Sequence, residues 1–282
     1  MLRPIKVMIM KLYERDYTKI NSEEERTALE KYIEYNSVMR VSSPNDDLRF
    51  SHPNLKCRKF LWHHTSLFPN DFLDFTVPHL LKSNFENLDF LSEAEEFKNF
   101  IYANGEETAI QNYIKSNRKW FIPGSVLRDY NFGHHDAYLF TEQMLGAEFK
   151  VDYLLLGKNS DGFSIVLVEF EKADTPFLLR TSNEVSKSVR KGLAQIDDWK
   201  RWLDKNKDYL FDSMRFSDKH IDIPTYRIYY CLVVSRRDYM NKEALNLRSQ
   251  KCYDMNNTKI VTFDRLCDNI KNLSGIGLWS NL

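Results

Sequence analysis

The chain has few of the residues that mark several common protein classes. Its 282 residues include nine Gly and four Cys, and the cysteines form no Cys-x-x-Cys pair. This spacing disfavours a zinc knuckle, and so few cysteines disfavour a disulfide framework in a chain of this size. The scarcity of glycine argues against a β-sandwich rich in tight turns. We find no P-loop, G-x-G-x-x-G or G-x-S-x-G motif, which disfavours P-loop NTPases, dinucleotide enzymes and serine hydrolases.

An excess of charge of one sign and a long apolar run are also lacking. Forty basic and forty acidic residues give a net charge of zero, so nucleic-acid binding would need a local basic patch. No window of about 18 apolar residues exists, and no signal peptide is evident, which predicts a cytoplasmic protein without a membrane segment. What is present is a composition that is 43% hydrophobic and 14% aromatic, typical of a globular protein with a substantial core.

The pattern of apolar residues predicts two domains. Residues 1–104, which end in an acidic, Phe-rich stretch, are expected to form a separate, mostly helical regulatory or assembly domain of unknown function. Residues 105–282 are expected to form an α/β domain with a mixed β-sheet flanked by helices. We predict helices in "NGEETAIQNYIKSNRKWF", in "AYLFTEQMLG" and over about 182–207. A hairpin should join "EFKVDYLLLG" to "FSIVLVEFEK" through "KNSDG", and strands are expected in "YRIYYCLVVS" and at the start of "KIVTFDRLCDNIKNL".

The second hairpin strand ends in two carboxylates. Glu169 and Glu171 follow the apolar run "IVLV" and share one face of the strand, roughly 6.5 Å apart, while Phe170 points the other way. If the hairpin pairs as its turn implies, Asp152 of the first strand approaches Glu169. Three clustered carboxylates raise one another's pKa unless a cation neutralises them, and oxygen ligands select Mg²⁺ or Mn²⁺. In the alternative interpretation these acids lie on an exposed strand end and pair with Lys150 or Lys172.

A basic helix is expected to follow the hairpin. In "GLAQIDDWKRWL", Gln195 and Trp199 share a helix face with Lys191, one turn earlier. A glutamine, an aromatic ring and several cations suit a nucleic-acid backbone and an unstacked base. The alternative is an amphipathic helix that packs Trp199 on the sheet.

Together these residues resemble the PD-(D/E)XK nucleases. The family places an acid on one strand and an acid-x-lysine at the end of the next, and Asp152 and Glu169 fill the first two places. The motif order "EETAIQNYIKSNRKWF", "LGAEFKVDYLLLG", "IVLVEFEKAD", "GLAQIDDWKRWL" and "KIVTFDRL" is similar to the nuclease domain of Shedu-type antiphage defence proteins. The resemblance covers about three-fifths of the chain. It implies a restriction-endonuclease-like fold and a Mg²⁺-dependent nuclease that acts on foreign or phage DNA as a homo-oligomer.

The resemblance also implies roles for individual residues. Asp152, Glu169 and the Phe170 carbonyl would hold the metal, and Gln195 would position a phosphate or a water. Cations and an aromatic ring would contact nucleic acid, namely Arg190, Lys191, Trp199 and Lys172. Glu106 or Glu107 would add a further carboxylate.

The chain departs from the family pattern at the lysine position. Glu171 stands there, and lysine follows one place later as Lys172. Either a bulge turns Lys172 inward, or Glu171 serves as a third carboxylate. A catalytically silent protein that binds or senses nucleic acid is therefore the alternative to a nuclease, and a plain interaction protein is a third possibility.

Overall fold

The computed structural model describes residues 89–117, 119–133, 136–179, 184–214, 216 and 221–273, with 20, 22–27, 29–30 and 73–74. Most of the predicted N-terminal domain, residues 1–104, lies outside the described residues.

A mixed β-sheet forms the centre of the structure, as the sequence predicted. Its order is β1-β2-β3-β4-β5-β6, with antiparallel pairs from β1 to β4 and parallel pairs from β4 to β6. The expected hairpin is confirmed: β3 and β4 pair from Asn159 opposite Gly162, where a positive φ of 116° turns the chain. The strands are β1 (Leu73–Asp74), β2 (Asp136–Leu145), β3 (Phe149–Asn159), β4 (Gly162–Phe170), β5 (Ile228–Val233) and β6 (Thr258–Val261).

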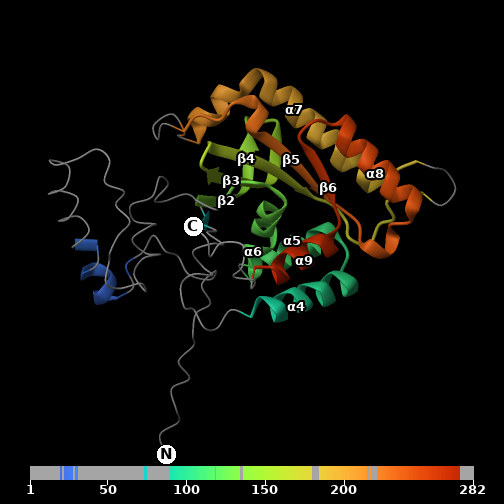
Figure 1. The fold of residues 1–282 in the computed structure, drawn as a ribbon, viewed down its shortest axis with the longest axis horizontal. Helices are drawn as coiled ribbons and strands as arrows, with labels where there is room; N and C mark the ends of the chain where they lie inside the picture. The colour runs from blue at the N-terminus through green and yellow to red at the C-terminus, as the bar shows by residue number, and fades with distance from the viewer. Residues whose placement is uncertain are drawn as a thin grey trace, which may run out of the picture.

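Helices cover both faces of this sheet (Figure 1). One face carries α7 (Lys187–Ser213) and α8 (Lys242–Asp254), and the other carries α4 (Phe90–Ala103), α5 (Glu107–Ser116), α6 (Phe121–Gly124) and α9 (Phe263–Lys271). Short 3₁₀ turns lie at Ser125–Asp129, Thr225–Arg227 and Arg237–Tyr239. Among the described residues, none of the helices combines the length and the apolar character needed to span a bilayer.

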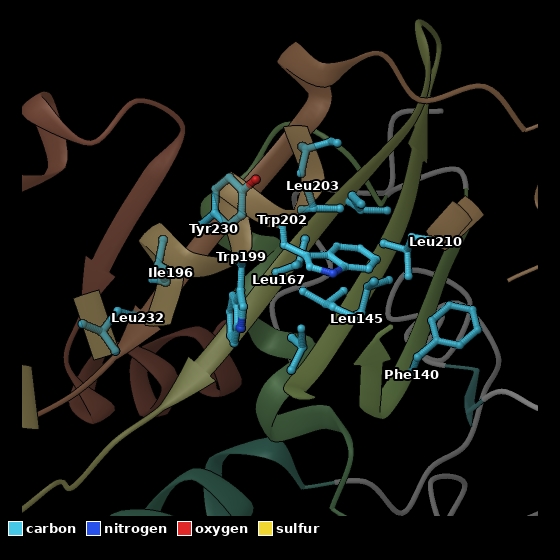
Figure 2. Close-up of a cluster of buried hydrophobic side chains, with 14 of the residues drawn as sticks. Phe140, Leu145, Leu167, Ile196, Trp199, Trp202, Leu203, Leu210, Tyr230 and Leu232 are labelled. Atoms are coloured by element: carbon cyan, nitrogen blue, oxygen red, sulfur yellow. The ribbon is translucent and has the colours of Figure 1, made fainter. Parts of the chain in front are cut away.

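Strand alternation divides the core into two clusters, one on each face. Along β4, Val166, Val168 and Phe170 pack toward α4, α5 and α9, whereas Ile165 and Leu167 pack toward α7. Figure 2 shows the second cluster, where Trp199 and Trp202 of α7 lie over strand side chains that include Leu167 and Leu232. The period of two in the strand and the 3.6-residue period in the helix account for this arrangement.

Two sequence predictions in this region need correction. "AYLFTEQMLG", expected to be a helix, is strand β2. Its side chains are buried on both faces, with Ala137 and Leu139 in one core cluster and Tyr138 and Phe140 in the other, so no polar alternation marked it as a strand. Gly146, which resembled a helix end, has φ +61° in the turn before β3. Helix α8 was not anticipated, because Ala244 is its one fully buried residue.

Helix α4 lies before the boundary predicted at 104/105, yet it belongs to the same core. Phe90, Ala94, Phe97 and Ile101 are buried with α9 residues such as Phe263. The core under the sheet therefore extends at least to Phe90.

A buried ion pair links α4 to the segment before α6. Lys119 is 4% exposed and Glu93 is 6% exposed, and the Lys119 ammonium lies 2.8 Å from Glu93 Oε2 and 2.6 Å from Glu96 Oε1. The Tyr113 hydroxyl is 2.8 Å from the same nitrogen. Burial lowers the pKa of Lys119, but the bonds to Glu93 and Glu96 outweigh it and raise that pKa overall.

We expect Lys119→Met to lower the free energy of unfolding by about 3–5 kcal/mol, because it removes the ammonium group that pairs with the buried Glu93 carboxylate. Urea unfolding measures this difference. The matched control is Lys115→Met, because Lys115 is 68% exposed and its pair with Glu142 contributes less than about 1 kcal/mol. Equal losses for the two variants would contradict the role of the buried pair.

Candidate metal centre

Asp152 and Glu169 are brought side by side by the register of the hairpin. Tyr153 pairs with Val168, so the next position outward sets Asp152 against Glu169 at the end of the β3–β4 ladder. There the Phe170 amide donates a hydrogen bond of 2.8 Å to Asp152 Oδ2. The Phe170 carbonyl points to the same side of its strand as its amide, and thus toward Asp152.

The predicted orientation of the acids is also found. Phe170 belongs to the α4–α5–α9 core cluster, so Glu169 and Glu171 point to the α7 face by strand alternation. Both side chains are buried, with Glu169 2% and Glu171 1% exposed. The alternative interpretation, an exposed strand end, is therefore wrong. Lys150 and Lys172 pair elsewhere, with Glu142 and Glu106.

Burial and mutual repulsion favour the protonated forms of these acids. Burial raises the pKa of Glu169 to about 10, and the neighbouring Asp152 and Glu171 add to the rise. Burial also raises the pKa of Asp152 to about 7, against the stabilising bond from the Phe170 amide. The pKa of Glu171 is raised by burial too, although Lys191 opposes the shift. The positive charge near these acids is thus too small to balance their negative charge when all of them are ionised.

Lys191 of α7 supplies the cation found beside the acids. Its ammonium lies 2.8 Å from Glu171 Oε1 and 3.2 Å from Glu107 Oε2. The sequence left open whether Glu106 or Glu107 joins the cluster, and the structure brings Glu107 there. Lys191 bridges Glu171 and Glu107, and its expected contact with a nucleic-acid backbone stays a prediction. The bridging role was not foreseen, although its place one turn before Gln195 on the basic helix was the available signal.

Lys172 and Arg190 lie apart from the buried acids. Lys172 pairs with Glu106 at 2.7 Å and is 42% exposed, so no bulge turns it inward, and Glu171 occupies the position where the family pattern has lysine. Arg190 is 55% exposed and lies 3.5 Å from Glu184. Both remain on the surface, where contact with nucleic acid stays a prediction.

Helix α7 approaches the strand ends closely at Gly192. A Cβ at this position would lie 2.4 Å from Leu232 Cδ1 and 3.2 Å from Glu171 Cγ, so a side chain would push the helix away from the acids. Gln195 follows on the same helix face and is half-buried.

Trp199, proposed as a stacking platform, is fully buried. Figure 2 shows it in the α7 core with Ile196 and Leu232. A base cannot reach its ring, so the prediction that Trp199 contacts nucleic acid is wrong and the amphipathic-helix alternative is right for this residue.

The residues at the strand ends fit a hard divalent cation with partly solvent coordination. Within the described ranges, Glu169 Oε2 is buried without a hydrogen-bond partner, and a buried carboxylate oxygen requires a cation or a proton. Those ranges contain no group of three or more His, Cys, Asp or Glu that could hold a metal ion, so waters would have to complete the coordination. Mg²⁺ is commonly held by one or two carboxylates and several waters, which matches Asp152, Glu169 and the Phe170 carbonyl.

The raised pKa of Glu169 predicts how metal-free stability depends on pH. Its folded-state pKa of about 10 lies above the ordinary 4.5, so the folded state binds this proton more tightly than the unfolded state does. The contribution of this group to stability is then fully present below about pH 4.5 and is lost as the pH rises toward 10. We expect Glu169→Gln to flatten this fall, as measured by urea unfolding in EDTA across that range. The exposed Glu148→Gln should keep the wild-type slope, and a wild-type slope in Glu169→Gln would contradict the burial of an acid at this position.

Comparison with family models gives a match over more than half of the chain. Residues 104–267 match the family model described as Shedu protein SduA, C-terminal. No curated protein matches the chain. The matched range begins at the loop between α4 and α5 and includes Glu107, Asp152, Glu169, Glu171 and Lys191.

Proposed function

This chain belongs to the Shedu SduA C-terminal family, a defence-related family, and we propose on that basis that it is a PD-(D/E)XK-type nuclease. In this proposal the enzyme hydrolyses phosphodiester bonds of foreign or phage DNA with Mg²⁺ or Mn²⁺. The observation that carries the proposal is the buried Glu169 carboxylate next to Asp152, with its Oε2 lacking a hydrogen-bond partner among the described residues. A homo-oligomer and a cytoplasmic location stay predictions.

In the proposed mechanism, Asp152, Glu169 and the Phe170 carbonyl would hold the divalent cation. When bound, such a cation supplies a nucleophile from water at neutral pH and offsets the charge that grows on the phosphate. Asp152 is fixed by the Phe170 amide, which orients its carboxylate before any ligand arrives.

Glu171 and Lys191 form the second part of the proposed mechanism. Glu171 orients the attacking water and accepts its proton, because its raised pKa makes it a stronger base than an ordinary glutamate. Lys191 holds Glu171 in place and provides positive charge close to the phosphate. Gln195, one turn along α7, positions a phosphate oxygen or a water.

Removing either metal-binding carboxylate should abolish both metal binding and cleavage. We expect Asp152→Asn and Glu169→Gln to lose the heat of Mn²⁺ binding in isothermal titration and to leave plasmid DNA uncut. The exposed Glu148→Gln is the matched control and should behave as wild type. Cleavage by wild type and by both variants at equal rates would refute the site.

Substitution of Lys191 should change the rate of DNA cleavage without weakening Mn²⁺ binding. We expect Lys191→Met to leave Mn²⁺ affinity equal or higher, because one positive charge is removed from the site. DNA cleavage should slow by about 10²–10³-fold, the usual cost of losing one group that stabilises transition-state charge. Lys191→Arg should recover part of the rate. Unchanged cleavage by Lys191→Met would remove Lys191 from the mechanism.

A nuclease-fold protein that binds or senses nucleic acid without cutting it is the second candidate. The observation that favours it is Lys191 itself, since an ammonium already neutralises part of the acidic cluster. In that case Mn²⁺ titration of the wild type gives no carboxylate-dependent heat, although DNA still binds.

A further inference from the structure

A cationic cleft opens along the free edge of the sheet, between α8 and the start of α9. Its volume is about 560 Å³. Four cations line it, and Asp129 is the single carboxylate among its lining residues; the cations are Arg237, Arg248, Lys259 and Arg265. Apolar side chains of α8 and β6, including Leu245 and Ile260, complete the walls.

The positive charge of this cleft is only partly neutralised. Asp129 accepts hydrogen bonds from Arg265 and from Asn269, so its charge is matched by Arg265. Lys259 donates to the uncharged carbonyl of the same residue. Arg248 forms no ion pair with any residue in the described ranges. Lys259 and Arg248 are thus left without an acidic partner in the part of the chain that the structure describes.

Arg237 is also available for a ligand. Its pair with Asp268, at 2.6 Å, joins side chains that are 63% and 40% exposed. An exposed ion pair of this kind contributes little to stability, so Arg237 can exchange Asp268 for a phosphate at small cost. Its guanidinium group presents the paired donors that suit phosphate oxygens.

The cleft lies at the same end of the sheet as the acidic cluster. Phe170, next to Glu169, pairs with Val233 of β5, and Val233 pairs with Val261 of β6. Arg237 and Arg265 follow these two strands in the chain. Two strand spacings separate β4 from β6, or about 10 Å, which corresponds to about three nucleotide steps along one strand of a duplex.

From this arrangement we propose that the α8–β6 cleft binds the phosphodiester backbone of the nucleic-acid substrate, a few nucleotides from the scissile bond. This inference rests on the proposed function. Arg248, Lys259 and Arg237 contact phosphate oxygens, and the apolar wall at Leu245 and Ile260 accommodates the sugar.

The test measures binding without cleavage. Fluorescence anisotropy of a labelled 30-base-pair DNA duplex in EDTA, over a series of salt concentrations, compares wild type with Arg248→Glu. We expect Arg248→Glu to bind about five- to tenfold more weakly and to lower the slope of log K against log[salt] by about 0.9 for each lost contact. Arg201→Glu, which makes the same charge change on an exposed residue of α7, should bind as wild type. Thermal melting of both variants checks that they fold.

The outcomes separate this inference from the proposed function. Equal affinities of Arg248→Glu and Arg201→Glu for the DNA duplex overturn the cleft as a backbone site. Binding of poly-glutamate but not of duplex by the wild type overturns it as well. If Arg248→Glu weakens binding while Mn²⁺ titration gives no carboxylate-dependent heat, the cleft stands and the nuclease proposal falls. If Glu169→Gln loses Mn²⁺ binding while Arg248→Glu binds DNA as tightly as wild type, the nuclease proposal stands and the cleft falls.

Discussion

The burial of Glu169 against Asp152 is the constraint on which the rest of the site depends. An apolar sheet offers no counter-charge to two carboxylates. Burial raises the pKa of both acids, and Asp152 adds to the rise at Glu169. The Phe170 amide donates a hydrogen bond to Asp152, but one oxygen of Glu169 has no hydrogen-bond partner among the described residues. A group arranged in this way favours a proton or a cation, and sites of this kind are where function is commonly found.

The position of α7 determines how the acids can act. Because Gly192 has no side chain, the helix lies directly over Leu232 and Glu171, and Lys191 reaches Glu171 and Glu107. Trp199, two turns further on, is buried beneath the same helix and fixes its distance from the sheet. The helix therefore both packs the core and carries the cation of the site.

Two polar features lie where the parallel strands end. The acidic cluster lies at β3 and β4, and the cationic cleft lies at the edge strand β6. Acids that favour a divalent cation and arginines that favour phosphate thus lie at strands two places apart in the sheet. Their complementary charges suit a single polyanionic ligand that extends across this end, in keeping with the general tendency of open α/β sheets to bind ligands beyond the carboxyl ends of their strands.

The sequence by itself determined the mixed sheet with its flanking helices, the β3–β4 hairpin, and the shared face of Asp152, Glu169 and Glu171. These follow from local patterns, because strand alternation and turn residues act over a few positions. It misread β2, whose residues are buried on both faces, and Trp199, whose helical spacing suits a core or a surface equally. Only the tertiary structure decided that Lys191 rather than Lys172 joins the acids, that Glu107 rather than Glu106 meets it, and that α4 belongs to the core. Those contacts join segments tens of residues apart, and no local period encodes how close two such segments pack.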